Sequence, residues 1–157
     1  MANEVKTKNI TKATFTITLA SLADNAGRSS LAINNATTKY PAALIYLSLV
    51  ASGTPTADKT YDIYLLRGND PASSDWRTDA WAGTDAAFTP VNAALLGQII
   101  TTATASGTFR KAFDTSPLGP LGPEWGIGVY CNGVGGGGAL AAGGHYAGYV
   151  NYVPEIQ

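Results

Sequence analysis

The chain has 157 residues, of which only 13% are charged, and its formal net charge is −1. This length suits one domain with a continuous core, and the near balance of basic and acidic residues excludes the clustered positive charge by which proteins bind nucleic acid. A single cysteine excludes an internal disulfide framework, and no stretch approaches the ~20 apolar residues of a membrane-spanning helix. We therefore expect a soluble, single-domain protein made in a reducing cytoplasm, with no secretion signal, no nucleic-acid partner and no membrane partner.

The chain begins with the polar sequence MANEVKTKN, which contains Lys6 and Lys8. We expect residues 1–12 to form a flexible N-terminal arm and residues 13–157 to form the folded domain. The two lysines either solvate this arm or contact a partner, so they are candidate interface residues. The next segment, ATFTITLASL, alternates apolar residues with threonine and alanine, which is typical of a half-buried strand.

Eight segments have the hydrophobic pattern of strands and are separated by turn residues. One of them, ALIYLSLVA, is apolar on nearly both faces, as in a strand covered by a second sheet or by a neighbouring subunit. The next, YDIYLLR, follows after a turn, and we expect these two strands to form a central hairpin. The expected strands are residues 13–22, 29–34, 43–51, 61–67, 95–102, 108–113, 124–131 and 145–153. This pattern predicts an all-β fold, a two-sheet antiparallel sandwich of the jelly-roll type.

The segment 68–90 is rich in turn formers and contains Trp76, Trp81 and Phe88. Loops of this length in compact domains are often functional, and exposed tryptophan is frequent at interfaces. Alternatively, both tryptophans fold back as a lid on the sandwich. Both interpretations stay open, and Trp76, Arg77 and Trp81 are candidate interface residues.

The C-terminal part begins with SPLGPLGP, whose prolines and glycines predict an extended crossover. In the following strand, EWGIGVYCN, alternate residues from Trp125 to Cys131 share one face. The glycines on its other face let a backbone or a bulky side chain approach closely. The last strand contains Tyr146 and Tyr149, which either anchor a partner or serve as ordinary strand formers, and both are candidate interface residues.

Few residues could carry catalysis. The only histidine, His145, has no acidic neighbour in sequence, so we interpret it as a surface residue rather than a base or a metal ligand. The aspartates of NDPASSDWRTDAWAGTD stand among turn formers and lack the spacing of a calcium loop, and we interpret them as turn and cap residues. Cys131 is expected to be a buried, unreactive thiol. We predict no catalytic residues, no metal, no cofactor and no enzymatic activity.

Three segments, NATTKYPAALIYLSLVASGT, YDIYLLRGND and FDTSPLGPLGPEWGIGVYCN with its following glycine and alanine loop, resemble a family of small proteins encoded in tailed-phage and prophage structural modules. The resemblance covers the chain from about Thr14 to Pro154. It implies a virion structural protein, often a jelly roll, and first of all a capsid decoration or cement protein. Its partners would be the major capsid protein or other virion proteins, and further copies of itself in a dimer or trimer.

The same resemblance leaves a second function open. The chain would then be a neck, collar, tail-fibre or baseplate component, in which aromatic residues of the long loop stack on host glycans. An enzyme such as a glycan hydrolase would require converging carboxylates with perturbed pKa values.

Overall fold

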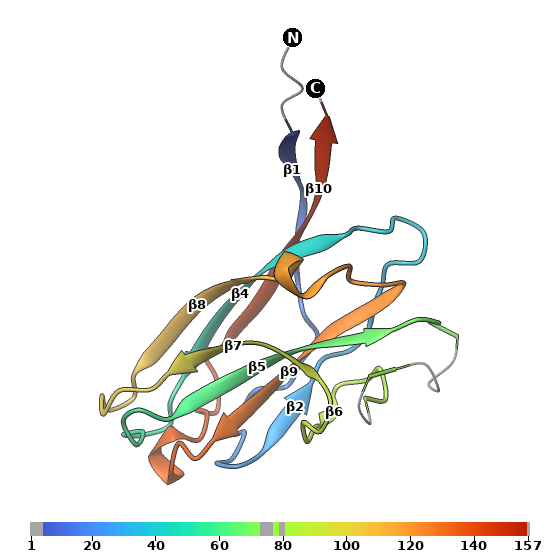
Figure 1. Ribbon diagram of the computed structural model, residues 1–157. Coiled ribbons are helices and arrows are strands. Elements are labelled where there is room, and N and C mark those ends of the chain that lie inside the picture. The colour runs from blue at the N-terminus through green and yellow to red at the C-terminus, as the bar shows by residue number, and fades with distance from the viewer. Residues whose placement is uncertain (1–4, 73–76, 79–80, 157) are drawn as a thin grey trace.

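The computed structural model describes residues 5–72, 77–78 and 81–156, and side chains within 12–72, 77–78 and 81–152. Two antiparallel sheets pack as a sandwich (Figure 1), and no α-helix occurs in the described residues. Two short 3₁₀ helices, η2 (Ser116–Leu118) and η3 (Gly136–Gly138), lie in connections. The prediction of an all-β, single-domain, two-sheet antiparallel sandwich is confirmed. Within the same ranges, no helix has the length and apolar character needed to cross a membrane.

The strand order is that of a jelly roll. Sheet A contains, in spatial order, β1 (Val5–Thr14), β10 (Tyr146–Ile156), β4 (Ala42–Val50) and β8 (Thr108–Asp114). Sheet B contains β6 (Ala86–Ala87), β2 (Gly27–Ser29), β9 (Glu124–Asn132), β5 (Thr60–Gly68) and β7 (Ala94–Ile100), with β3 (Ile33–Asn34) paired to β9. Without the two-residue strands β3 and β6, the pairs are nested: β1 with β10, β2 with β9, β4 with β8, and β5 with β7. A long hairpin folded across two sheets gives this pairing.

The core lies between the two sheets and is built from alternate residues of the central strands. In β4, Ile45 and Leu49 are fully buried, and in β9 every residue from Glu124 to Val129 is buried. An aromatic cluster joins the two layers at one end. The Trp125 ring lies 5.6 Å from that of Phe15 and 5.1 Å from that of Tyr149, centroid to centroid, in edge-to-face geometry. Such pairs stabilise a core beyond their buried area.

The expected central hairpin is wrong. β4 pairs with β8 and β10 in sheet A, whereas β5 pairs with β7 and β9 in sheet B. The connection between them therefore crosses from one sheet to the other, and backbone hydrogen bonds from Gly53 to Gly137 and from Thr56 to Val134 hold it. Both strands are apolar because each is central in its own sheet. An apolar sequence of this kind does not show which strand it pairs with.

The first strand is displaced from its expected position. β1 covers Val5–Thr14, so residues 5–12, expected within a flexible arm, belong to this strand, and the expected strand 13–22 ends at Thr14. The displacement arises because β10 extends to Ile156 and offers backbone partners to the polar N-terminal residues. The alternating residues after Thr14 form a crossing segment instead, in which Phe15 and Leu19 are buried.

β1 and β10 extend beyond the sandwich as a two-stranded ribbon (Figure 1), formed by residues 5–8 and 153–156. β4 accompanies β10 only as far as Tyr152, so four residues of β10 continue past it, about 13 Å at the usual strand rise. The register of β1 shifts between Asn9 and Lys12, a bulge just below the ribbon. Such irregularities bend and twist a strand.

The long loop covers the outer face of sheet B. Trp81 is 3% exposed and Phe88 is 6% exposed, and both pack against Leu66. The glycines of β9 make this contact possible. A Cβ at Gly126 would meet the Trp81 ring at 2.8 Å, and one at Gly128 would meet the Phe88 ring even closer. The close approach expected over these glycines is confirmed. Trp81 folds back onto the sandwich as a lid, the second of the two interpretations of this loop.

Candidate functional site

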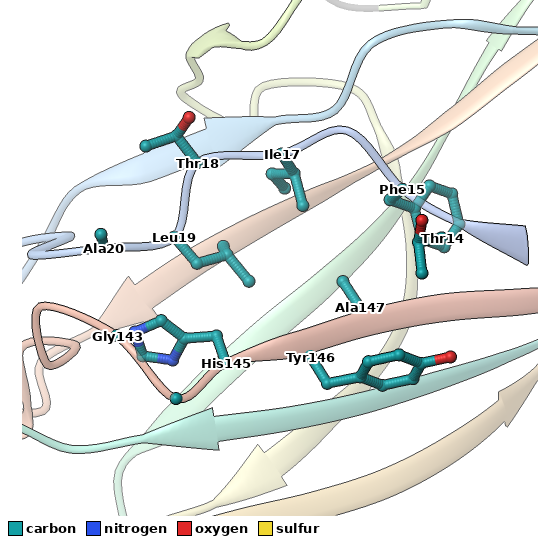
Figure 2. A pocket seen from close by; sticks show the side chains of 11 residues that line it. Thr14, Phe15, Ile17, Thr18, Leu19, Ala20, Gly143, His145, Tyr146 and Ala147 are labelled. Atoms are coloured by element: carbon teal, nitrogen blue, oxygen red, sulfur yellow. The ribbon is translucent and has the colours of Figure 1, made fainter.

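Two adjoining grooves, one on the outer face of sheet A and one at its corner, share Gly144 and Tyr146. We call the larger one, of about 620 Å³, the outer groove. It is lined by Tyr46, Leu47, Ser48, Arg110, Lys111, Ala112, Gly144 and Tyr146. The smaller one, of about 340 Å³, is the corner groove between residues 14–20 and 143–147. Figure 2 shows the corner groove.

The period of β4 determines which residues face the outer groove. Ile45, Leu47 and Leu49 are buried toward the core, so Tyr46 and Ser48 lie on the opposite face, and Tyr46 is 42% exposed. The register places Ser48 between Arg110 of β8 and Tyr146 of β10. One polar row therefore runs across three strands.

The neighbours of Tyr46 and Tyr146 are small. Gly148 of β10 and Ala112 of β8 flank Tyr46 in register. A Cβ at Gly148 would collide with the hydroxyl end of Tyr146, so the Tyr146 ring lies over this glycine. The Lys12 ammonium is 5.6 Å from the centroid of the same ring, within the range of a cation–π contact.

Arg110 supplies the main positive charge of the outer groove. Its Nε donates a hydrogen bond to Ser48 Oγ at 3.3 Å, its side chain is exposed, and it forms no ion pair within the described residues. Lys111 points elsewhere: its ammonium donates to the backbone oxygen of Gln98 at 2.9 Å, across to β7. The guanidinium of Arg110 therefore has donors directed at solvent.

The corner groove forms where β1 leaves sheet A. Phe15 N–H donates to Ala147 O at 3.0 Å, after which the chain crosses toward sheet B and Thr16 O accepts from Leu31 N–H. In Figure 2 the Leu19 side chain extends toward the 143–147 segment, whereas Thr18 points away from it. The floor of this groove is apolar.

His145 occupies the rim of the corner groove and binds its own chain. Its Nδ1 accepts the Val50 N–H at 3.2 Å, and its Nε2 lies 2.9 Å from Ala141 O. An Nδ1 that accepts leaves the proton on Nε2, which then donates to Ala141; the hydrogen-bond partners assign this neutral tautomer. His145 is half-buried and connects the glycine-rich loop to β4, a structural role that the sequence did not indicate.

The structure separates the candidate interface residues into two groups. Lys6, Lys8, Tyr146 and Tyr149 belong to β1 and β10 of sheet A, where the register sets Lys6 opposite Glu155 and Lys8 opposite Val153. Arg77 and Trp81 belong to the loop over sheet B, and Trp76 lies outside the described residues. Among the candidates whose side chains the structure describes, only Tyr146 lines the outer groove.

Two of these candidates pack against the fold: Trp81 is buried and Tyr149 is half-buried. The Trp81 Nε1–H donates to Ser30 O at 3.1 Å beneath the loop. Tyr149 packs between Phe15 and Trp125, and burial raises the pKa of its hydroxyl. Both residues therefore stabilise the fold, and the burial of Trp81 leaves its ring little surface for a partner.

Arg77 also has an internal partner. Its Nε and Nη2 bind the two carboxylate oxygens of Glu124 at 2.8 and 2.7 Å, and its Nη1 donates to Ala82 O at 2.6 Å. The side chains of Arg77 and Glu124 are 12% and 4% exposed. All three nitrogens of the guanidinium thus bind the protein itself and hold the loop to the start of β9.

Cys131 and Asp70 have the structural roles that the sequence predicts for them. Cys131 is buried in the core, as expected, and burial raises its pKa to about 12. Asp70 Oδ1 accepts the Ala72 N–H at 2.9 Å, as a turn residue does, whereas Asp75 and Asp79 lie outside the described residues. No group of three or more His, Cys, Asp or Glu side chains with metal-binding geometry occurs among the residues described.

Asp85 makes the stability of the loop depend on pH. Burial acts to raise its pKa, but hydrogen bonds from Arg28 and Thr18, each 2.5 Å long, outweigh burial and hold the pKa below its ordinary value. The unfolded chain titrates near ~3.9, so this stabilisation is complete above that pH and is lost as the pH falls through the lower folded pKa.

We expect the free energy of unfolding, measured with urea, to fall as the pH drops below ~3.9 through the lower folded pKa of Asp85, and Asp85→Asn to make this fall shallower. Equal pH dependence in the variant and the parent would contradict the assignment.

The chain matches no known family model, no curated protein and no solved structure at a significant level.

Sequence reasoning missed Tyr46, Ser48 and Arg110. A signal was present, because Tyr46 and Ser48 are the two polar residues in the middle of ALIYLSLVA and stand two positions apart on one face. Arg110 lies in TFRKAFD, where it alternates with two phenylalanines and so points to the other face of the strand. Only the register of β4, β8 and β10 brings the three side chains together.

Proposed function

We propose that this chain is a structural protein of a tailed-phage particle, and that it acts as a capsid decoration protein that binds the shell and stabilises it. The observation that carries this proposal is the ribbon of residues 5–8 and 153–156, which projects from a jelly-roll body (Figure 1). An isolated two-stranded ribbon is only marginally stable in water. A partner that covers this ribbon would stabilise it, which makes it a suitable docking element.

The composition of the ribbon supports specific docking over random pairing of strands. Pairs of uncharged residues, such as Val5 with Ile156 and Thr7 with Pro154, alternate with pairs that contain a lysine. Lysine and proline discourage the addition of a stray strand at an exposed edge. Since only 13% of all residues are charged, the body has a weakly charged surface that neighbouring subunits can cover at small desolvation cost.

Repeated docking sites on a shell favour a chain that binds through several weak contacts at once. A dimer or trimer of this protein, with one ribbon per subunit, would gain binding strength through effective concentration. The partners in this proposal are the major capsid protein or another virion protein, together with further copies of this chain. The resemblance of FDTSPLGPLGPEWGIGVYCN to phage structural proteins supports the same assignment.

Deletion of residues 1–8 tests the ribbon. We expect the deleted chain to remain folded, because Lys12, Ala13 and Thr14 keep their partners in β10 and Phe15 keeps its place in the core. We expect it to lose binding to particles purified from a phage strain that lacks the gene, as measured by cosedimentation.

Ile100→Ser is the control for this deletion. Ile100 is 63% exposed on β7 of the other sheet, and its replacement should leave cosedimentation unchanged. If the deleted chain stays folded and binds like the parent, the ribbon is not the docking element.

A further inference from the structure

We propose that the outer groove of sheet A binds a saccharide that carries a carboxylate group. This inference concerns a different surface from the ribbon and does not depend on the proposed function. A glycan site on the tryptophans of the long loop is not available at Trp81, because that ring is buried over Gly126. The exposed Tyr46 and the half-buried Tyr146 of sheet A offer the alternative.

The groove has aromatic walls and a floor of small residues. Tyr46 of β4 and Tyr146 of β10 are diagonal neighbours, because Tyr46 is in register with Gly148 and Tyr146 is in register with Ser48. The Tyr146 ring lies over Gly148 on one side of Tyr46, and the small residue Ala112, which lines the groove, stands beside Tyr46 on the other. A pyranose ring has an apolar face of C–H groups that packs on such an aromatic ring, while its hydroxyls reach the tyrosine and serine oxygens.

The charge of the groove selects for an anion. The Arg110 guanidinium uses Nε for Ser48, and Lys12 lies at the far side of the Tyr146 ring. The described residues that line the groove include no aspartate or glutamate. Asp114, further along β8, is engaged by the Tyr152 hydroxyl at 2.6 Å and by Ser116. The planar fork of arginine matches a carboxylate, so an acidic sugar would place its carboxylate at Arg110.

The position of the groove favours a saccharide over a peptide strand. Both edges of β4 are paired, with β8 on one side and β10 on the other, so an extended peptide cannot add to the sheet at this point. The groove volume of about 620 Å³ falls in the range of small-ligand sites. A ligand here must lie on the face of the sheet and stack on its side chains.

The test is calorimetric titration of the full chain with trigalacturonate, an acidic trisaccharide. We expect binding, and we expect Arg110→Gln, Tyr46→Ala and Tyr146→Ala each to weaken it about tenfold or more. Leu95→Ala, which removes a comparably exposed apolar side chain from β7, should leave the affinity unchanged. Thermal unfolding establishes that each variant is folded.

Two further ligands identify what the groove recognises. Neutral galactotriose should bind at least about tenfold more weakly than trigalacturonate, and Arg110→Gln should not change its affinity. A triglutamate peptide should bind weakly and be insensitive to Tyr46→Ala. The proposal is overturned if trigalacturonate does not bind at millimolar concentration, if its binding survives all three groove substitutions, or if triglutamate binds equally well.

Discussion

Arg77→Ala should lower the free energy of unfolding by about 3 to 5 kcal/mol, one of the largest effects of any single substitution in this chain. The reason is that the substitution would leave Glu124 without its ion-pair partner. Glu124 is 3% exposed, at the start of β9, and Arg77 binds both of its carboxylate oxygens. Without the guanidinium, a buried carboxylate would have to remain unpaired or take up a proton.

The Arg28–Asp85 pair is the internal control for this prediction. Its side chains are 31% and 20% exposed, compared with 12% and 4% for Arg77 and Glu124. Water can therefore replace Arg28 more easily, and Arg28→Ala should cost roughly 1 kcal/mol. Urea unfolding of both variants measures the difference. If Arg77→Ala costs no more than Arg28→Ala, the buried pair is not what holds the loop to β9.

Trp81→Ala should lower the free energy of unfolding by about 3 to 5 kcal/mol as well. The substitution would leave a cavity over Gly126 between Leu66 and Phe88, and Ser30 O would lose the indole donor. Trp81→Phe, which restores most of the ring but not the hydrogen bond, should recover a large part of the loss. Urea unfolding at one temperature compares the three chains.

This substitution also separates the lid from an interface. If Trp81 acts only as a lid, the folded fraction of Trp81→Phe should cosediment with particles as the parent chain does. A variant with parental stability and impaired particle binding would instead make Trp81 a contact residue, contrary to its 3% exposure.

The fold class could be predicted because it depends on local pattern. The alternation in EWGIGVYCN placed Cys131 and Trp125 in the core, and its glycines predicted a close approach from outside, which Trp81 and Phe88 make. Turn residues delimited the strands from β4 onward to within a few positions, apart from the two-residue strand β6, whereas the first strand was displaced and the expected strand 29–34 is divided into β2 and β3. These are properties of single segments, and a sequence displays them directly.

Strand partners and the candidate site could not be predicted in the same way. The nearness of β4 and β5 in sequence favoured a hairpin, but both strands are central and each is paired on two sides in a different sheet. The outer groove depends on the register among β4, β8 and β10, whose residues are up to about a hundred positions apart in the chain. Likewise, Arg77 and Glu124 belong to distant segments, and their ion pair exists only in the folded protein.

The central proposal, that this chain decorates a phage capsid, is tested most directly by cryo-electron microscopy of particles produced by cells that carry its gene. We expect hundreds of copies spread over the shell, with the ribbon of residues 5–8 and 153–156 in contact with capsid or neighbouring subunits. A few tens of copies or fewer at one vertex or on the tail, or none on the particle, would contradict it.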